Sequence, residues 1–396
     1  MIPDPNTFRS EAERTLHDNI LRFWRERMVD EARGGFLGRI AGDGTPDPDA
    51  PKGAILCGRI LWAFAAAYRV TGRAEYLAMA LRARDYLLEK FYDPAYGGVY
   101  WSLRADGTPL DTKKQIYALG FAIYGLSELV RATGDERALA SAQQLFRSIE
   151  QHSFDARRNG YYEAFTREWG EIGDVRLSEK DANEKKTMNT HLHILEPYTN
   201  LCRVWDSPVL RDRLRNLIEV FLDRIYDPAT HHLGLFFSEE WVRRDAGFSY
   251  GHDIEASWLL LEAAGTLGDE ALTERVKQTT GLIASAAAEG IRADGSMIYE
   301  RYADGRTDDE RHWWVQAENV VGQLWLWRYH GDRAAYDRAA ACWRYIRDEI
   351  VDPAGGEWWW GVLPDGEKDR ANDKAGFWKC PYHNTRMCLE AMELLK

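Results

Sequence analysis

The chain has 396 residues, of which 45% are hydrophobic and 29% charged, and its formal net charge is -12 at pH 7. This composition predicts a soluble globular protein with a large core, and it argues against a nucleic-acid partner, because binding to phosphates requires clustered Lys and Arg. The N-terminus has no apolar signal core, and the most apolar stretch (residues 54–68) is interrupted by Arg59 and too short to span a bilayer, so we expect a cytoplasmic protein with no membrane partner.

A turn that combines glycine with aromatic or apolar residues recurs six times along the chain. Its glycines are Gly35, Gly98, Gly160, Gly234, Gly295 and Gly356. An Asp precedes most of these turns, at Asp30, Asp93, Asp155, Asp227 and Asp352. The glycines stand about 61 to 63 residues apart, except for one interval of about 74. This period is longer than that of most solenoid repeats, so each unit contains more than one helix.

Between consecutive turns, apolar residues return every three or four positions, which predicts amphipathic helices, usually two per unit. We expect twelve helices near residues 6–27, 54–70, 74–90, 115–133, 136–150, 187–205, 208–225, 253–268, 270–290, 312–331, 333–350 and 380–395. The first helix of most pairs is the more apolar, which suits an inner ring shielded by charged outer helices. A closed ring also needs no capping repeats. The sequence therefore predicts an all-α fold, an (α/α)6 barrel forming a single catalytic domain over residues 1–396.

Polar side chains that are rare elsewhere gather near the starts of the presumed inner helices. They are Arg59, Tyr117, His191, His193, His252, Glu255, His312 and His383. In a closed barrel, equivalent positions lie at the same end, so we expect these groups to converge on one cavity. Each histidine taken alone would be read as a satisfied core or capping residue. Their common phase in the repeat favours a functional site instead.

The chain contains 16 Trp and 19 Tyr, well above ordinary usage. Most of these rings are expected to fill the core of a wide barrel. Several share the phase of the histidines, among them Trp313, Trp314 and Trp378. Flat apolar rings beside polar groups are typical of sites that bind the C–H face and the hydroxyls of a sugar. The sequence thus indicates a carbohydrate cavity.

Imidazoles titrate near neutrality, so one ring can remove a proton while another, protonated, returns one. A metal is the first alternative, but His191 and His193 are two positions apart and face different sides of a helix, and no H-E-x-x-H motif is present. No nucleophile motif or phosphate-binding loop is present either. Five widely spaced cysteines without a C-x-x-C pair predict reduced core thiols. We therefore expect neither a metal nor a cofactor.

Paired carboxylates are the second alternative, because an acid and a base around the mouth of such a barrel could hydrolyse a glycosidic bond. The candidates are Asp181, Asp253, Glu255 and Glu318. Glu255 lies one turn beyond His252, however, and we expect its carboxylate to bond that ring and tune its basicity.

Four segments resemble the signature stretches of the cellobiose 2-epimerases, within the N-acylglucosamine 2-epimerase superfamily. They are MNTHLHILEPYTNL, GHDIEASWLL, RHWWVQAENVVG and DKAGFWKCPYHNTRMCLE. The similarity covers essentially the whole chain and implies an (α/α)6 barrel, in agreement with the repeat. It also implies an isomerase that inverts C2 of the reducing-end glucose, from cellobiose to glucosyl-mannose or from lactose to epilactose, without a cofactor.

The resemblance also implies roles for individual residues. His252 and His383 match the two acid/base histidines, and His193 matches a third that assists ring opening. The matching sugar-binding groups are Arg59, Tyr117, Asn189, Trp314 or its neighbour Trp313, and Trp378, with His191 and Glu255 beside them and Asp181 near the distal sugar. The expected partner is therefore a small carbohydrate, bound by a monomer or a weak homodimer.

Three other functions stay open on the sequence. A monosaccharide 2-epimerase or aldose–ketose isomerase would use the same histidines and differ only in the distal subsite. A glycoside hydrolase would depend on carboxylates instead. A non-catalytic sugar-binding module would not need so many titratable rings. The preferred sugar, whether cellobiose, lactose, mannobiose or mannose, also stays open.

Overall fold

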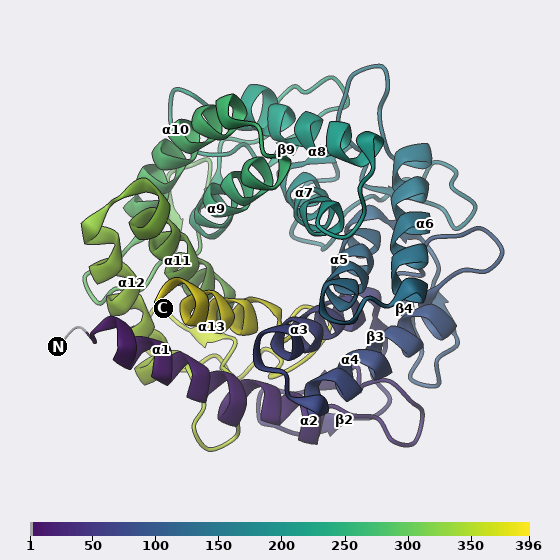
Figure 1. Ribbon diagram of the computed structural model, residues 1–396, viewed down its shortest axis with the longest axis horizontal. Helices are drawn as coiled ribbons and strands as arrows, with labels where there is room; N and C mark the ends of the chain where they lie inside the picture. Colours follow the sequence, from purple (N-terminus) through teal and green to yellow (C-terminus); the bar gives the residue numbers. More distant parts are fainter. Residues whose placement is uncertain (1–2) are drawn as a thin grey trace.

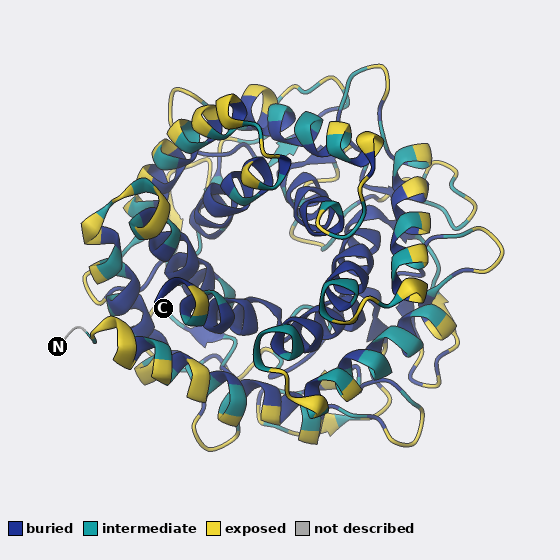
Figure 2. Cartoon of the chain, viewed as in Figure 1, coloured by how far each residue is buried: buried dark blue, intermediate teal, exposed yellow. Residues whose placement is uncertain are grey.

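Six helices of this chain are buried on nearly every face, and they form an inner ring. In the computed structural model, which describes residues 3–396, the inner helices stand around one axis and an outer layer of helices surrounds them (Figure 1). The inner helices are almost wholly buried, whereas the outer helices expose only their outward faces (Figure 2). A helix that is apolar all round must be covered on all sides, and the two-layer ring covers it.

The elements alternate strictly between the two layers along the chain. The inner helices are α3 (Ala54–Thr71), α5 (Ile116–Thr133), α7 (Met188–Cys202), α9 (Tyr250–Leu267), α11 (Trp313–Trp325) with η5 (Leu326–His330), and α13 (Tyr382–Leu394). The outer helices are α1 (Pro5–Arg14) with η1 (Thr15–Leu21) and α2 (Arg22–Arg27), α4 (Ala74–Tyr86) with η2 (Leu87–Phe91), α6 (Glu136–His152), α8 (Pro208–Val220) with η3 (Phe221–Ile225), α10 (Glu270–Ala287) with η4 (Ala288–Gly290), and α12 (Arg333–Tyr345) with η6 (Ile346–Ile350). Within the described residues, the twelve predicted helices and the (α/α)6 barrel are confirmed.

The same local signals end and start the helices of successive units. α3, α5 and α9 each end at a glycine in the left-handed region, Gly72, Gly134 and Gly268, with φ of 71°, 75° and 70°. Glycine adopts this conformation at little cost and stops a helix. An Asp side chain then caps α6, α10 and α12 by accepting a hydrogen bond from a backbone N–H in the first turn. Tight inner-to-outer hairpins result.

Short antiparallel strands join each unit to the next at one end of the barrel. The strands are β1 (Arg39–Ile40), β2 (Pro46–Asp47), β3 (Lys52–Gly53), β4 (Ser102–Leu103), β5 (Pro109–Asp111), β6 (Lys114–Gln115), β7 (Ala164–Phe165), β8 (Lys186–Thr187), β9 (Phe236–Phe237), β10 (Phe248–Ser249), β11 (Glu300–Arg301), β12 (Thr307–Asp308), β13 (Arg311–His312) and β14 (Gly361–Val362). The pairs β3–β4, β6–β7, β8–β9, β10–β11 and β13–β14 each link the segment before an inner helix to the following unit. A bridge between Ile40 and Ala375 makes the sixth link. The ring is therefore closed, and α1 packs against α13.

The six recurrent turns fold as small β-bridged loops, each closed by a pair of residues that flank it. The bridges are Val29–Phe36, Tyr92–Val99, Phe154–Tyr161, Tyr226–Leu233, Ile291–Met297 and Val351–Trp358. The fourth turn differs from the sequence prediction. Gly234 follows the bridged pair Tyr226–Leu233 instead of lying inside the loop, and the residue with left-handed backbone conformation is His231, with φ of 64°. The long third interval comes from the connection between α6 and α7, which is about ten residues longer than the connections that lead to α5 and α9.

A buried ion pair recurs with the turns. The turn Asp bonds a Lys in the segment that precedes the next inner helix, as in Asp30–Lys52 at 2.7 Å, Asp93–Lys114 at 2.9 Å, Asp155–Lys186 at 2.8 Å and Asp352–Lys374 at 2.6 Å. All eight side chains are at most 9% exposed. The pairs fix each turn against the first residues of an inner helix, where the candidate site lies.

Replacing Lys186 with Met is expected to destabilise the fold by about 3–5 kcal/mol, because the buried Asp155 carboxylate loses its partner. Lys186 also donates to the carbonyl oxygens of Asn159 and Glu239, at 2.7 Å and 2.9 Å. Chemical denaturation followed by circular dichroism measures the loss. Lys185→Met is the matched control, since Lys185 is exposed and one position earlier. Equal stability of the two variants would show that the recurrent pairs do not stabilise the ring.

Within residues 3–396, α3 alone is long and apolar enough to cross a membrane. In the barrel, 78% of this helix is buried against its neighbours. That burial is the pattern of a core helix.

Candidate active site

All six inner helices begin at the end of the barrel that carries the strands, so the side chains of their first turns meet. They enclose a cavity of about 360 Å³. Every inner helix contributes: Arg59 from α3, Tyr117 from α5, Asn189 and His193 from α7, His252 and Glu255 from α9, Trp313 and Trp314 from α11, and His383 from α13. The convergence predicted from the phase of the repeat is found in the structure.

His383 is held by a carboxylate behind it. Its Nδ1 lies 2.7 Å from Glu318 Oε1, and that carboxylate also accepts hydrogen bonds from Arg386 Nη2 at 2.7 Å and Trp258 Nε1 at 3.1 Å. Because Arg386 and Trp258 can only donate, this carboxylate acts as an acceptor, and His383 Nδ1 carries the hydrogen. The lone pair of its Nε2 is left free to accept a proton.

His193 has the same arrangement on α7. Its Nδ1 lies 3.1 Å from Glu196 Oε2, one helical turn further along. Burial opposes the charge of Glu196, but the Arg386 guanidinium and the bond to His193 together lower the pKa of this carboxyl group. The ring of Tyr117 packs edge-on against His193, with centroids 4.8 Å apart. His193 therefore also presents Nε2 as the unbonded nitrogen.

His252 begins α9 and is oriented by its own helix cap. Its Nδ1 lies 2.8 Å from the Oγ of Ser249, which also accepts from the backbone N–H of His252 at 3.3 Å. The indole of Trp314 contacts both His252 and His383, with ring centroids 4.8 Å and 5.5 Å away. Two imidazoles from different helices thus contact the same aromatic ring.

Burial lowers the pKa of His193, His252 and His383 below the usual value. For His383, the positive charges of Arg59 and Arg386 add to this effect. The rings are therefore neutral at neutral pH and can accept protons. By contrast, burial and the nearby Glu318 raise the pKa of Glu255 well above the usual value, which keeps that carboxyl group protonated.

Arg59 brings a cation to the cavity without a carboxylate partner. Its guanidinium is 4% exposed, lies 4.1 Å from the ring centroid of Phe121 and donates to the hydroxyl of Tyr117 at 2.9 Å. Among the ion pairs of residues 3–396, none includes Arg59. A buried cation that has no carboxylate partner is suited to stabilise negative charge that develops on a bound molecule.

One group of side chains has the geometry to hold a metal ion. Ligand atoms of Glu255, Glu318 and His383 all lie within 4.8 Å of one another. The guanidinium of Arg386 already bonds both carboxylates at 2.7 Å. A divalent ion would have to displace this cation or repel it, so the donor set fits an organic cation better than a metal.

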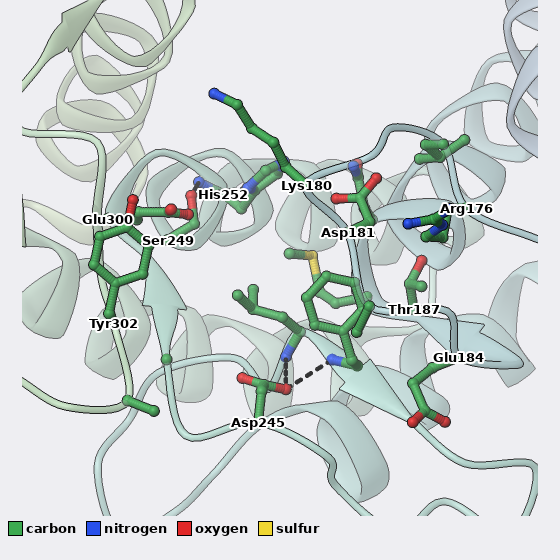
Figure 3. A pocket seen from close by; sticks show the side chains of 18 of the residues that line it. Arg176, Lys180, Asp181, Glu184, Thr187, Asp245, Ser249, His252, Glu300 and Tyr302 are labelled. Carbon is green, nitrogen blue, oxygen red and sulfur yellow. Dashed lines mark hydrogen bonds between the residues drawn. The ribbon is translucent and has the colours of Figure 1, made fainter.

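A second chamber of about 580 Å³ adjoins the reaction cavity, and we call it the outer chamber because strands and connecting segments line most of it. The two spaces share lining residues, including Lys180, Asp181, Asn189 and His252. Figure 3 shows Lys180 and Asp181 on the α6–α7 connection, facing the same space as Ser249 and His252. Asp181 Oδ2 accepts from the Ser178 backbone N–H at 2.8 Å, which fixes its orientation. The site thus has an inner and an outer room.

The model of the N-acylglucosamine 2-epimerase family matches residues 35–386. The chain belongs to this family. A cellobiose 2-epimerase from Bacteroides fragilis is 57% identical over 97% of this chain and 98% of that protein. One from Ruminococcus albus is 38% identical over 97% and 98%. The solved structure of the cellobiose 2-epimerase from Bacillus thermoamylovorans matches with a TM-score of 0.93 at 40% identity, over 98% of this chain and 99% of that one. The predicted resemblance is confirmed, and the chain is an isomerase of the epimerase class.

The tryptophans predicted to bind sugar also line the reaction cavity. Trp378 lines the reaction cavity, with its ring centroid 6.1 Å from that of Tyr117. Trp313 lines it too but packs against Trp360 at 4.6 Å, whereas Trp314 contacts both His252 and His383. The position of Trp314 favours it as the ring that stacks on a ligand.

His191 requires a correction. It is fully buried and lines neither chamber. Its Nδ1 lies 2.6 Å from the Thr187 carbonyl oxygen, and its Nε2 accepts from the Tyr161 backbone N–H at 2.9 Å. The two-residue spacing turns it away from the side of His193, so His191 joins α7 to the third turn instead of binding sugar.

Glu255 requires a second correction. It lines the cavity as expected, but its Oε1 accepts from Arg386 and lies 3.9 Å from His383 Nδ1. The His252 nitrogen that it was predicted to bond is taken by Ser249. Glu255 therefore lies next to His383 and is not bonded to His252.

The sequence reasoning missed the layer of charges behind the rings, although a signal for it exists. A charged residue stands three positions after three of the four cavity histidines, giving the pairs His193–Glu196, His252–Glu255 and His383–Arg386. On a helix this spacing places the charge one turn deeper on the same side. The sequence suggests Glu318 only as one of the carboxylates that could hydrolyse a glycosidic bond. Asp253, another such candidate, bonds His232 at 2.7 Å and lines neither chamber.

Proposed function

We propose that this chain catalyses cofactor-independent epimerisation at C2 of the reducing-end glucose of β-1,4-linked disaccharides, from cellobiose to glucosyl-mannose and from lactose to epilactose. The observation that carries the proposal is that His252 and His383, from two different helices, both contact Trp314 and line one cavity with Arg59. Reversible inversion of a carbon acid needs a proton acceptor on one face and a proton donor on the other.

The first step is opening of the pyranose ring, because C2–H becomes acidic only beside a free aldehyde. A histidine must give a proton to the ring oxygen and accept one from the C1 hydroxyl. His193 is the candidate for this exchange, since its Nε2 is free and it lies beside Tyr117. The hydroxyls near C1 and C2 would bind Tyr117, Arg59 and Asn189, all of which line the cavity.

The second step is transfer of the C2 proton to the free Nε2 of one imidazole. The electron pair of the C–H bond moves into the C1–C2 bond, and the aldehyde oxygen becomes the anion of a cis-enediolate. The Arg59 guanidinium is useful mainly at this stage, because the negative charge exists only in the transition state and the intermediate.

Rotation about the C2–C3 bond then presents the other face of C2. The negative charge of the enediolate favours protonation of the second imidazole, which takes up a proton from solvent and gives it to that face, and the ring closes as the epimer. Return of the proton to C1 would instead yield a ketose, so a small isomerase side activity is expected. We assign the outer chamber to the non-reducing sugar, with Asp181 as a hydroxyl acceptor.

The proposal also covers the domain organisation, the cellular location, the oligomeric state and the partner of the protein. One catalytic domain spans residues 1–396, and the protein is a cytoplasmic monomer or weak homodimer whose partner is a small carbohydrate. The closed ring of strand links supports a single domain. The net charge of -12 supports a neutral substrate over an anionic polymer.

The decisive measurement is proton NMR of the purified protein with cellobiose in D2O after exhaustive chelation. We expect glucosyl-mannose with deuterium at C2, because the proton that returns comes from a group in exchange with solvent. Mannose is the control substrate. Turnover of mannose but not of cellobiose would assign the chain to monosaccharide isomerisation, and free glucose from cellobiose would indicate hydrolysis. Activity lost on chelation and restored by a metal would contradict the cofactor-free mechanism.

A further inference from the structure

Arg386 lies on α13, one turn beyond His383, and its side chain is 2% exposed. It does not line the reaction cavity. Instead it borders a separate cavity of about 680 Å³ that opens between the C-terminal ends of the inner helices. The guanidinium therefore forms part of the wall between the reaction cavity and this second space, which we call the rear cavity.

Arg386 bonds carboxylates from three different inner helices. Its Nη1 donates to Glu196 of α7, and its Nη2 donates at 2.7 Å to both Glu255 of α9 and Glu318 of α11. The hydroxyl of Tyr382, on its own helix, contacts both Nη1 and Glu196. A guanidinium is suited to this task because its planar fork carries several fixed donors, which a Lys ammonium lacks.

The carboxylates held by Arg386 are the ones that bond the cavity histidines. Glu318 accepts from His383 at 2.7 Å, and Glu196 accepts from His193 at 3.1 Å. No other side chain among residues 3–396 bonds both Glu196 and Glu318. One buried cation is thus connected to two of the three rings that the proposed reaction uses.

We propose that Arg386 is the positioning residue of this site: it keeps Glu196 and Glu318 ionised and fixed, so that His193 and His383 carry hydrogen on Nδ1 and present Nε2 to the sugar. The inference rests on the proposed function, because it assigns work to these rings. It adds a group that touches no substrate and acts only through the two carboxylates.

Charge balance supports the assignment. The buried groups around the rings are Arg59, Arg386, Glu196, Glu255 and Glu318, with Tyr117 and Tyr382 beside them. With Glu255 protonated, two cations balance two carboxylates. Removal of Arg386 leaves one uncompensated negative charge in a buried site, which must be neutralised by uptake of a proton. That proton would go to a carboxylate or to an imidazole, and either choice removes a catalytic base.

The direction of the pH effect follows from the same charges. Arg386 and Arg59 both lower the pKa of His383 at present, in addition to burial. Without Arg386, this pKa rises towards the usual value, so the ring stays protonated to higher pH. The acid limb of the pH–rate profile, where activity falls as the base form is lost, is then expected to move to higher pH.

The first test is chemical rescue of Arg386→Ala. We expect its epimerisation rate to fall about 100-fold, at the low end of what general acid–base catalysis supplies. Millimolar guanidinium should restore about tenfold of that rate, since the rear cavity gives it a path to the vacated position. Arg328→Ala is the matched control: Arg328 lines the same rear cavity but has no ion-pair partner within the described residues. Its rate and its response to guanidinium should equal those of the wild type.

A second variant keeps the test decisive if Arg386→Ala fails to fold, as judged by circular dichroism. Arg386→Lys retains the charge but not the fork, so we expect the acid limb to stay near that of the wild type while the rate falls. Wild-type rates in a folded Arg386→Ala, or reduced rates with no guanidinium rescue and an unchanged acid limb, would overturn the proposal.

Titration of the imidazole signals by NMR in the absence of sugar separates this inference from the reaction itself. We expect the pKa of His383 to rise in Arg386→Ala and to stay unchanged in Arg328→Ala. An unchanged His383 would overturn the role of Arg386 whatever the substrate. A wild-type protein that does not epimerise cellobiose would instead refute the proposed function, independently of this titration.

Discussion

Replacing either His252 or His383 with Asn is expected to lower the rate of epimerisation by about 1,000-fold, within the range that a positioned acid or base supplies. Neither ring can do the work of both, because they arise from α9 and α13 and each makes its own contact with Trp314. Asn keeps a polar side chain of moderate size, so the cavity is not emptied. Rates measured with cellobiose by NMR, at unchanged helical circular dichroism, report the loss.

The two single variants should differ in a way that identifies the face each ring serves. A variant that has lost one base still has the other, so it should exchange the C2 proton of only one epimer with D2O. His252→Asn and His383→Asn are expected to retain exchange in opposite epimers. His312→Asn is the control, because His312 lines the same cavity but its Nε2 is bonded to Glu310 at 2.8 Å. Retention of most epimerisation in either variant, or exchange of both epimers, would refute the two-base mechanism.

The sequence predicted the architecture because the fold repeats. Six turns at a nearly constant spacing, each followed by an apolar and then a charged helix, indicate a ring without reference to any contact. The same period placed His193, His252 and His383 near the starts of inner helices, and the structure brings them into one cavity. Local signals that recur are more informative than any one of them alone, because randomly placed residues would not fall at the same position in several repeats.

What the sequence did not predict depends on side-chain direction and on long-range contacts. His191 shares the phase of His193 but points to the third turn, where the Tyr161 backbone N–H binds it. Glu255 has the right spacing to reach His252, yet Ser249 bonds that ring first and Arg386 binds the carboxylate. Periodicity places a residue on a helix but does not select among competing partners.

The charge network behind the site shows the same limit more sharply. Glu196, Glu318 and Arg386 lie on three helices, and their sequence separations reach 190 residues. Their pairing follows from ring closure, which brings α13 beside α11 and α3 and across from α7. A spacing of three residues after each histidine marks where a charge lies, but only the closed barrel shows which charges meet.

Arg59 is the residue whose loss should separate turnover from binding. Arg59→Leu is expected to lower kcat by about 100-fold to 1,000-fold, as removal of one oxyanion donor does in other sites, with a small change in KM. The guanidinium is 4% exposed, and its hydrogen bonds go to the Tyr117 hydroxyl at 2.9 Å and the Cys380 sulfur at 3.5 Å, neither of which is a formal anion. Steady-state rates with cellobiose provide both constants.

An unpaired buried cation is costly to keep, so its charge must be used at some point in the cycle. The open-chain sugar is neutral, whereas the enediolate is an anion, and only the second gains from Arg59 by a full charge interaction. Arg59→Lys, which retains the charge on a shorter fork-less group, should recover part of kcat. Deuterium exchange at C2 should fall in parallel with epimerisation, because both pass through the same anion. A rise in KM with unchanged kcat would instead assign Arg59 to binding of the ground-state sugar and leave the enediolate without its charge partner.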